Sequence, residues 1–300
     1  MVKNDQSIVK KRSFQGKRKR SPEMNSDLGK YKYKYEVHMH TSQASACGRT
    51  DGKDYIAKFK SLGYDGMIIT DHFYRGNTRP SRSLPWSEYI DEFCSGYEAA
   101  KEEGDKQGFK VFFGWEENQH GDEYLIYGPD KDWLKAHPEI RDADHLEYLK
   151  LIHEAGGLIV QAHPFRERGY LSDIYLHPYQ CDAMEACNNG NPEYQDQLAY
   201  NFCKDRGIIM TSGTDLHFAP DLEDSVGGML FEKPIESIYD YVNAIKSGEG
   251  FMPIIPDVRK ELPSDAVNTL PMTLFDEKNV GRSVELSDLF PEKRNLAAGE

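Results

Sequence analysis

Residues 31–41 read YKYKYEVHMHT, and the rest of the chain is interpreted from this stretch. Side chains alternate in character from Tyr33 to His40, and a period of two is typical of a β-strand. His38 and His40 therefore lie on one face of the expected strand, near its carboxyl end. Two imidazoles so arranged are placed to hold a metal ion from a rigid edge. The alternative is a surface strand with two incidental histidines, and repetition of the pattern further along the chain argues against it.

Further along, short apolar runs alternate with segments of helical spacing. The expected strands cover residues 33–40, 66–70, 110–115, 123–127, 158–162, 182–186 and 208–211. The expected helices cover residues 54–62, 87–103, 143–155, 193–206 and 235–246. This alternation indicates βαβ units, an α/β class and a parallel sheet. Because functional groups at the carboxyl ends of many strands converge only in a barrel, we expect a closed or nearly closed barrel.

Five of the ten histidines lie at the carboxyl ends of these strands, together with one Glu and one Asp. The strand-end residues are His38, His40, His72, Glu116, His163, Asp215 and His217. So many imidazole and carboxylate groups exceed what one tetrahedral ion can use, so two or three divalent ions are implied. Glu116 is suited to bridge two of them. Mixed His and carboxylate ligands suit zinc, manganese or iron better than magnesium or calcium.

Composition limits the class of protein. A chain of 300 residues with 38% hydrophobic content can bury one large core or two ordinary ones. The apolar runs are short and the mean hydropathy is −0.71, so neither a membrane span nor a secretory signal is expected. A cytoplasmic location follows as the expectation. The five cysteines form no CxxC pair and are odd in number, which favours reduced thiols over a disulfide framework.

Charge is distributed unevenly along the chain. The net charge is −13, but residues 1–34 hold eleven Lys and Arg against three acids, which is +8 and leaves −21 for the remainder. Such an acidic body is a poor binder of nucleic-acid backbone. Residues 1–30 form a basic, apolar-poor tail that is expected to be disordered. Its cluster Lys17–Arg20 offers contacts to nucleic acid or an acidic partner, although a solvated tail without function is the simpler interpretation.

The ordered motifs along the chain resemble those of the PHP superfamily, the family of polymerase and histidinol phosphatase domains. The motifs are His38-x-His40, Thr70-Asp71-His72, Gly114-Trp115-Glu116, Ala162-His163-Pro164-Phe165-Arg166 and Ser212-Gly213-Thr214-Asp215-Leu216-His217. The resemblance covers residues 31–255 and implies a distorted (β/α)7 barrel that hydrolyses phosphate esters with two or three metal ions. It also implies that His38, His40, Glu116 and Asp215 hold one ion, Glu116 and His163 a second, and His72 and His217 a third.

Two positions depart from the family pattern. Where many members carry an Asp or His shortly after the His-x-His, the nearest candidate in this chain is Cys47. Cys47 is either a thiolate ligand or a small buried residue without metal. Where many members carry a histidine on the fourth strand, this chain has Tyr124, with His120 four residues earlier as a substitute from the loop.

The expected reaction is metal-assisted hydrolysis of a small phosphorylated substrate. Asp215 or His217 would handle protons. Arg166 would either clamp the phosphate or form an ion pair with an acid, and Asp71 would orient a neighbouring imidazole. Two alternative functions stay open. The chain could hydrolyse an amide, because the same residues would activate water for that reaction, or it could be a non-catalytic metal-binding regulatory domain, which would need the same ligands.

The pattern weakens beyond residue 255. Residues 270–275 and 282–286 are expected to pair as a hairpin within a C-terminal extension of residues 256–300, to which no function is assigned. The expected organisation is thus a tail of residues 1–30, a barrel of residues 31–255 and this extension.

Overall fold

The structure is a computed structural model, and it describes residues 28–224, 227–262 and 269–290. The expected disordered tail falls almost entirely on residues 1–27, outside the described residues; Leu28–Lys30 form a single 3-10 turn, η1. Within the described part of the chain, no helix combines the length and the apolar character needed to cross a membrane.

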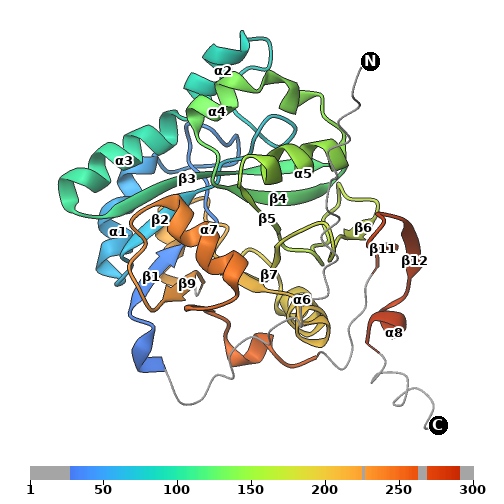
Figure 1. Ribbon diagram of the computed structural model, residues 1–300. Helices are drawn as coiled ribbons and strands as arrows, with labels where there is room; N and C mark the ends of the chain where they lie inside the picture. The colour runs from blue at the N-terminus through green and yellow to red at the C-terminus, as the bar shows by residue number, and fades with distance from the viewer. Residues whose placement is uncertain (1–27, 225–226, 263–268, 291–300) are drawn as a thin grey trace, which may run out of the picture.

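A nine-stranded sheet curves into a nearly closed barrel at the centre of the molecule (Figure 1). Its order is β10-β9-β1-β2-β3-β4-β5-β7-β8. The strands are β1 (Tyr33–Glu36), β2 (Gly66–Ile69), β3 (Lys110–Gln119), β4 (Asp122–Tyr127), β5 (Leu158–Gln161), β7 (Ala183–Asn188), β8 (Met210–Gly213), β9 (Met229–Phe231) and β10 (Phe251–Pro253). The edges approach each other, because Ser212 Oγ on β8 donates to the carbonyl of Ile254, just past β10, over 2.7 Å. The expected α/β barrel class is confirmed.

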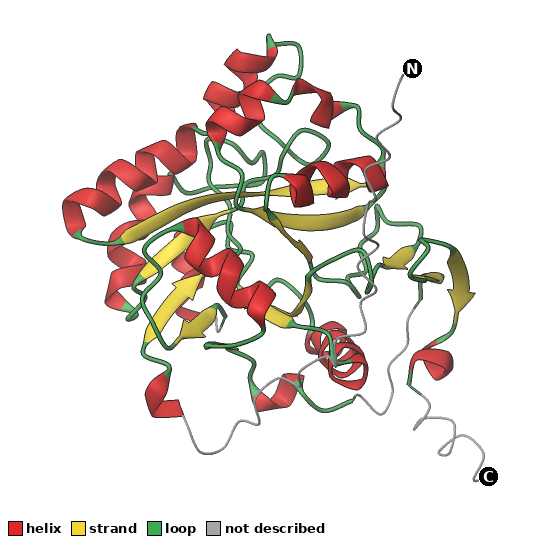
Figure 2. Ribbon diagram, in the orientation of Figure 1, coloured by secondary structure: helices red, strands yellow, loops and turns green. Residues whose placement is uncertain are grey.

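Helices cover the outside of the barrel (Figure 2). They are α1 (Ile56–Ser61), α2 (Trp86–Phe93), α3 (Ser95–Gln107), α4 (Lys131–Ala136), α5 (His145–Glu154), α6 (Glu193–Arg206) and α7 (Ile238–Ser247). The helix expected over residues 87–103 is divided into α2 and α3 at Cys94, and α4 was not expected. Helix α6 ends at Gly207, whose φ of 63° is the left-handed conformation that glycine adopts at low cost.

The sequence suggested a parallel sheet, but the sheet is mixed. Strands β3 and β4 form an antiparallel hairpin. The turn between them consists of His120 and Gly121, with φ of 59° and 105°. Two positive φ values in a two-residue loop are the requirement of a type I′ hairpin turn. The turn lets β3 continue past the expected end of the strand. Glu116 therefore lies within β3, paired with Leu125, and not at its terminus.

The pleat of the hairpin assigns its side chains to two faces. Residues opposite each other in an antiparallel pair share a face, and alternate residues point to opposite faces. Glu116, Leu125 and Glu123 hence face the barrel interior, where Leu125 joins the central core. Trp115 and Tyr124 face outward and pack in the core beneath α2, α4 and α5.

A second, three-stranded sheet lies beside the barrel and contains β6 (Ile174–Leu176), β11 (Met272–Phe275) and β12 (Gly281–Val284), in the order β12-β11-β6. Strands β11 and β12 pair as an antiparallel hairpin, and β11 pairs in parallel with β6. A short helix, α8 (Leu286–Leu289), follows. Within the extension expected over residues 256–300, residues 263–268 and 291–300 lie outside the described residues.

Candidate metal centre

The loops that follow β1, β2, β5 and β8 meet at one end of the barrel, together with the β3–β4 hairpin. Among the described residues, eight His, Asp and Glu side chains form four groups in which the ligand atoms all lie within 4.8 Å of one another. The groups are His38, His40 and Glu116; His38, His163 and Asp215; His72, Glu116 and Glu123; and His40, His72 and His217. The seven strand-end residues singled out in the sequence therefore form one cluster, with Glu123 as an additional member.

A buried carboxylate holds His38 from behind. Its Nδ1 lies 2.8 Å from Oε1 of Glu185 on β7. Its Nε2 faces the cluster, 3.3 Å from Glu116 Oε1 and 3.5 Å from Asp215 Oδ1, and makes no hydrogen bond. Burial lowers the pKa of His38, but the three carboxylates outweigh it and raise the pKa well above the usual value. The position thus attracts positive charge, and a carboxylate behind the imidazole fixes which nitrogen faces a ligand.

His40 presents a lone pair to a carboxylate. Its Nδ1 lies 3.1 Å from the hydroxyl of Ser45, and that hydroxyl donates to Asp71 Oδ1 over 2.7 Å. The Ser45 oxygen therefore accepts from Nδ1–H, which leaves a lone pair on Nε2, 3.0 Å from Asp215 Oδ1. Burial, with the imidazoles around it, lowers the pKa of His40 well below the usual value, so its ring is neutral. The contact would be repulsive without a cation between the atoms. Asp71, expected to orient an imidazole, reaches His40 through Ser45.

Each oxygen of Glu116 faces a different imidazole. Oε1 lies 3.0 Å from Nε2 of His163, and Oε2 lies 2.7 Å from Nδ1 of His72. The second pair is oriented so that neither atom makes a hydrogen bond. Burial raises the pKa of Glu116, but His72, His38 and His163 outweigh it and hold the pKa well below its usual range. An ionised carboxylate whose two oxygens face different ligand sets has the arrangement of a bridging ligand.

Glu123 is the cluster residue that the sequence reasoning missed. Its Oε2 lies 3.4 Å from His163 Nε2, and its Oε1 lies 3.8 Å from His72 Nδ1. Tyr124 points to the outer face and His120 lies in an exposed turn, so neither substitutes for the family histidine at this cluster. The signal was available in the turn at residues 120–121, since that turn fixes the register that brings Glu123 to the face of Glu116.

Asp215 is held by a guanidinium on the side away from the imidazoles. Arg166 Nη2 donates to Asp215 Oδ2 over 2.6 Å and to Asn188 Oδ1 over 2.9 Å, while its Nε donates to Asn191 Oδ1 over 2.8 Å. Of the two expected roles for Arg166, this geometry corresponds to the ion pair with an acid. Burial raises the pKa of Asp215, but Arg166 and then His38 outweigh it and hold the pKa well below its usual range.

His217 lies at the mouth of the cluster. Its Nδ1 lies 2.7 Å from the backbone carbonyl of Asp215, and its ring stacks on His40 with 4.3 Å between centroids. Its side chain is 28% exposed, more than those of His38 and His40, which are fully buried. The carbonyl accepts from Nδ1–H, so the lone pair of His217 is on Nε2.

Cys47 lies beside the outer imidazoles and is partly buried. Burial raises the pKa of its thiol, but hydrogen bonds to His217 and His72 outweigh burial and lower the pKa to about 6. The thiol is thus poised to ionise next to two imidazoles, as a ligand at the edge of the cluster would be. Cys47 nevertheless belongs to none of the four groups of ligand atoms among the described residues.

Two cluster residues have backbone conformations that side chains disfavour. His163 has a φ of 29° and Asp215 a φ of 53°. Left-handed conformations cost a non-glycine residue about 1–2 kcal/mol. Each residue lies two positions past the end of a strand, β5 or β8, where the chain turns to bring the side chain over the barrel end. Strain of this kind is concentrated at functional sites.

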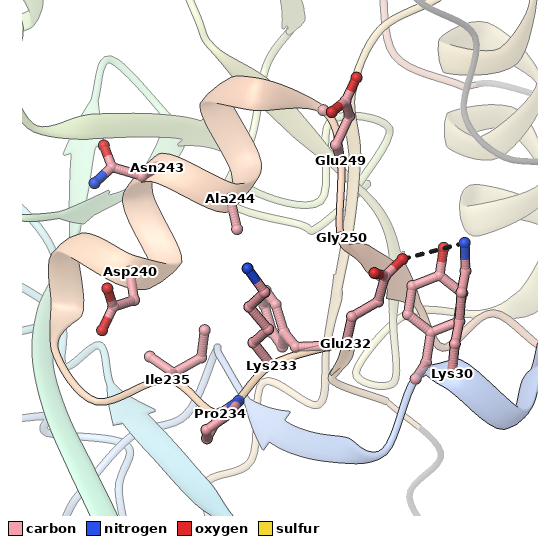
Figure 3. A pocket seen from close by; sticks show the side chains of 13 residues that line it. Lys30, Glu232, Lys233, Pro234, Ile235, Asp240, Asn243, Ala244, Glu249 and Gly250 are labelled. Carbon is pink, nitrogen blue, oxygen red and sulfur yellow. Dashed lines mark ion pairs between the residues drawn. The ribbon is translucent and has the colours of Figure 1, made fainter.

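One cavity lies away from the cluster. A groove of about 650 Å³ is bounded by η1, the end of β9 and α7 (Figure 3), so it lies at the amino end of β1, whereas the cluster follows its carboxyl end. Lys30 Nζ lies 3.1 Å from Glu232 Oε1 at its rim. Asp240, also in its lining, is engaged in the capping box of α7. The groove carries no cluster of ligand atoms comparable to the metal centre within the described residues.

Comparison with known proteins supports the fold. No family model and no curated protein matches the sequence. A two-domain protein containing a predicted PHP-like metal-dependent phosphoesterase from Bacteroides vulgatus is similar over 77% of this chain and 68% of its own, with a TM-score of 0.54 and 14% identity. PsfC from Pseudomonas syringae is similar over 77% of this chain and 94% of its own, with a TM-score of 0.50 and 15% identity.

These likenesses define the class at the level of architecture. The chain has the barrel fold of a PHP-like protein, so the resemblance noted in the sequence is confirmed for the fold. At 14–15% identity the likeness establishes the fold alone.

Proposed function

We propose that the chain is a metal-dependent hydrolase that cleaves a small phosphate ester at the cluster. The observation that carries the proposal is a set of buried ligand atoms that face one another without hydrogen bonds: His38 Nε2, His72 Nδ1 and Glu116 Oε2. Buried polar atoms in native proteins are almost always paired, and three together at one point indicate a missing cationic partner. A donor set of imidazoles and carboxylates fits zinc, manganese or iron.

We keep the assignment implied by the resemblance and add Glu123, although the four groups combine the same residues differently. One ion would be held by His38, His40, Glu116 and Asp215, a second by Glu116, His163 and Glu123, and a third by His72 and His217. Cys47 stands beside this last pair. Divalent ions in such a site activate water at neutral pH and polarise phosphoryl oxygens.

The remaining steps fall to the side chains of this chain. Arg166 keeps Asp215 ionised and in place through its hydrogen bond. His217 would transfer protons through Nε2 when the third site is empty and would hold the third ion through the same atom when it is filled, because its Nδ1 is engaged by a carbonyl. Asp215 is the weaker candidate for proton transfer. Its two oxygens face His40 and Arg166, and its lowered pKa leaves it without a proton to donate.

The test uses two adjacent glutamates on opposite faces of β3. Glu116→Gln should lose more than one metal ion per chain and reduce phosphate release from phenyl phosphate by at least about 100-fold, because the bridging carboxylate is lost. Glu117→Gln, the matched control, should keep metal content and turnover, since Glu117 lies on the outer face and accepts from the backbone N–H of Arg75. Elemental analysis and phosphate release measure both.

The same assay separates the alternatives. Cleavage within an amide panel without phosphate release would establish the amidohydrolase alternative. Bound metal without turnover on either class would favour a non-catalytic domain. Metal loss in Glu117→Gln with retention in Glu116→Gln would overturn the bridging role of Glu116.

A further inference from the structure

A second arginine, Arg168, stands near the metal cluster and is held by backbone carbonyls. Arg168 Nη1 donates to the carbonyl of Glu167 over 3.0 Å, and its Nη2 donates to the carbonyl of Gly190 over 2.9 Å. Within the described residues, no carboxylate oxygen lies in ion-pair range of this guanidinium. Other arginines of the same region differ, since Arg166 and Arg259 pair with Asp215 and Asp196.

The position of Arg168 follows from the glycine that it contacts. A Cβ built on Gly190 would lie 3.2 Å from Arg166 Nη2 and 3.2 Å from Asp215 Oδ2. Gly190 thus contacts Arg168 through its carbonyl and lies against Arg166 and Asp215 at the border of the cluster. Arg168 is partly exposed and Gly190 is exposed, so solvent reaches this contact.

The loop that carries Arg168 covers the hairpin side of the cluster. A small cavity between this loop and β4 is lined by Glu123, His163, Arg166 and Leu171, with neighbours on each element. The loop begins directly after His163, whose backbone is fixed by a hydrogen bond from its N–H to Glu185 Oε2 over 3.1 Å. Arg168 is therefore held at the same end of the barrel as the cluster, by its hydrogen bonds to the carbonyls of Glu167 and Gly190.

The hydrogen-bonding capacity of the two arginines differs. Arg166 directs its donors to Asp215, Asn188 and Asn191, so its fork is occupied by the protein. A guanidinium has five N–H donors, and two carbonyl contacts leave three on Arg168. Three donors on a planar cation are sufficient for a bidentate contact to a carboxylate or phosphate. In a chain of net charge −13, a guanidinium near the cluster with three donors left over is suited to bind an anion.

We propose that Arg168 forms an anion subsite, which binds a second acidic group on the alcohol portion of the substrate, so that the chain prefers phosphate esters of acidic alcohols to those of neutral ones. The inference rests on the proposed phosphoesterase function and specifies its substrate class. The alternative, in which Arg168 binds the phosphoryl group that is cleaved, predicts equal effects on both kinds of ester.

The experiment compares 3-carboxyphenyl phosphate with phenyl phosphate in the metal-loaded full chain, with released phosphate as the readout. The wild-type ratio of kcat/KM for the acidic to the neutral ester should be about ten, as expected for one charge-assisted contact. In Arg168→Gln the ratio should fall to about one, because KM for the acidic ester rises. Arg168→Lys should restore part of the preference for the acidic ester. Arg282→Gln is the control, because Arg282 is an exposed arginine on β12 of the second sheet, which contributes no residue to the cluster; it should keep the ratio.

The outcomes distinguish the two proposals. Turnover of both esters with a wild-type ratio near one overturns the subsite, as does a ratio in Arg168→Gln that equals the wild-type value. An equal loss on both esters in Arg168→Gln assigns the residue to the cleaved phosphoryl group and overturns the subsite. Absence of turnover on either ester by metal-loaded wild type overturns the proposed function itself, and the subsite with it.

Discussion

At the scale of single residues, Glu36 joins the two loops that carry the innermost ligands. Its Oε1 accepts from the backbone N–H of Val37 over 2.9 Å, of His38 over 2.8 Å and of Thr214 over 3.0 Å. One oxygen atom thus ties the loop after β1 to the loop after β8. Burial raises the pKa of Glu36 to about 7 in spite of these hydrogen bonds. Glu36 touches no ligand atom, and it positions the backbone from which His38 and Asp215 project.

Glu36→Ala should therefore loosen the cluster without removing a ligand. The three amides would lose their acceptor in a buried site, and each unpaired group costs about 1–3 kcal/mol, so the free energy of unfolding should fall by several kcal/mol. Metal affinity should fall as well, while Glu36→Gln, which keeps one carbonyl oxygen, should recover most of both. Urea unfolding and metal titration measure these effects. Wild-type metal affinity in Glu36→Ala would contradict the positioning role.

Glu117 gives the chain a pH dependence that is independent of the metal ligands on the other face. Burial raises its pKa to about 8, from 4.5, although the backbone N–H of Arg75 stabilises the charged form. The folded state thus holds a proton that the unfolded state releases. The stability associated with this proton is complete below pH 4.5 and is lost as pH rises to about 8, by on the order of a few kcal/mol.

Glu117→Gln should remove this loss, because glutamine keeps the acceptor oxygen and does not ionise. The variant should gain stability over wild type as pH rises from 5 to 8, measured by urea unfolding at each pH. Glu88→Gln, at an exposed position on α2, should follow the wild-type curve. A constant difference between Glu117→Gln and wild type across this range would show that Glu117 is not a buried titrating group.

At the scale of elements, α3 packs against the loop that follows the His-x-His motif. A Cβ on Gly96 would lie 2.1 Å from Oγ1 of Thr41. Thr41 donates to Asp71 through both its N–H and its hydroxyl, over 2.6 Å and 2.8 Å. A glycine on the helix therefore permits the close approach that orients the loop between β1 and α1.

Gly96→Ala should push Thr41 away and disturb the loop, even though alanine favours helix. Overpacking of this kind costs about 1–3 kcal/mol, and metal affinity should fall with stability. Glu102→Ala, on the same helix with a side chain 73% exposed, should change neither by more than a few tenths of a kcal/mol. Thermal melting and metal titration are the measurements. A more stable Gly96→Ala with normal metal binding would show that the contact relaxes.

How far the sequence predicts the elements depends on how local their signals are. His72 and His163 lie just past β2 and β5, as expected, because each follows a short apolar run that ends at a polar motif. The β3–β4 hairpin was missed because a His-Gly turn is a weaker signal than Asn-Gly, and with it the position of Glu123. Glu185 was also missed, since a glutamate within an expected strand gives no sign that it will contact His38 across the barrel.

At the scale of the whole molecule, the barrel closes through short strands that carry almost no pattern. Strands β9 and β10 have three residues each, and β6 also has three. Three residues are too few to show a period, so these strands were not expected from the sequence. Their positions are set by pairing with strands that are distant in the sequence, and the pattern of neighbouring residues does not predict such pairing.

Metal should stabilise the entire fold, because the ligands come from both halves of the chain and converge only when it is folded. An ion that binds the folded state alone adds about 2.7 kcal/mol at a concentration of 100 Kd. Addition of a chelator should therefore lower Tm, and readdition of manganese or zinc should restore it. In Asp215→Asn the response should be much smaller. Equal Tm values with and without chelator, in protein shown to bind metal, would contradict this coupling.

The pairing of β1 on both of its edges has a consequence for biosynthesis. Strand β1 pairs with β2 on one edge, and on the other Tyr33 lies opposite Phe231 of β9, almost two hundred residues later. A ribosome thus releases His38 and His40 long before the strand that completes their surroundings exists. Pairing over such separations is slow, since the entropy of loop closure must be overcome first. The centre is completed only after β9 has been synthesised, and a nascent chain exposes one edge of β1 until then.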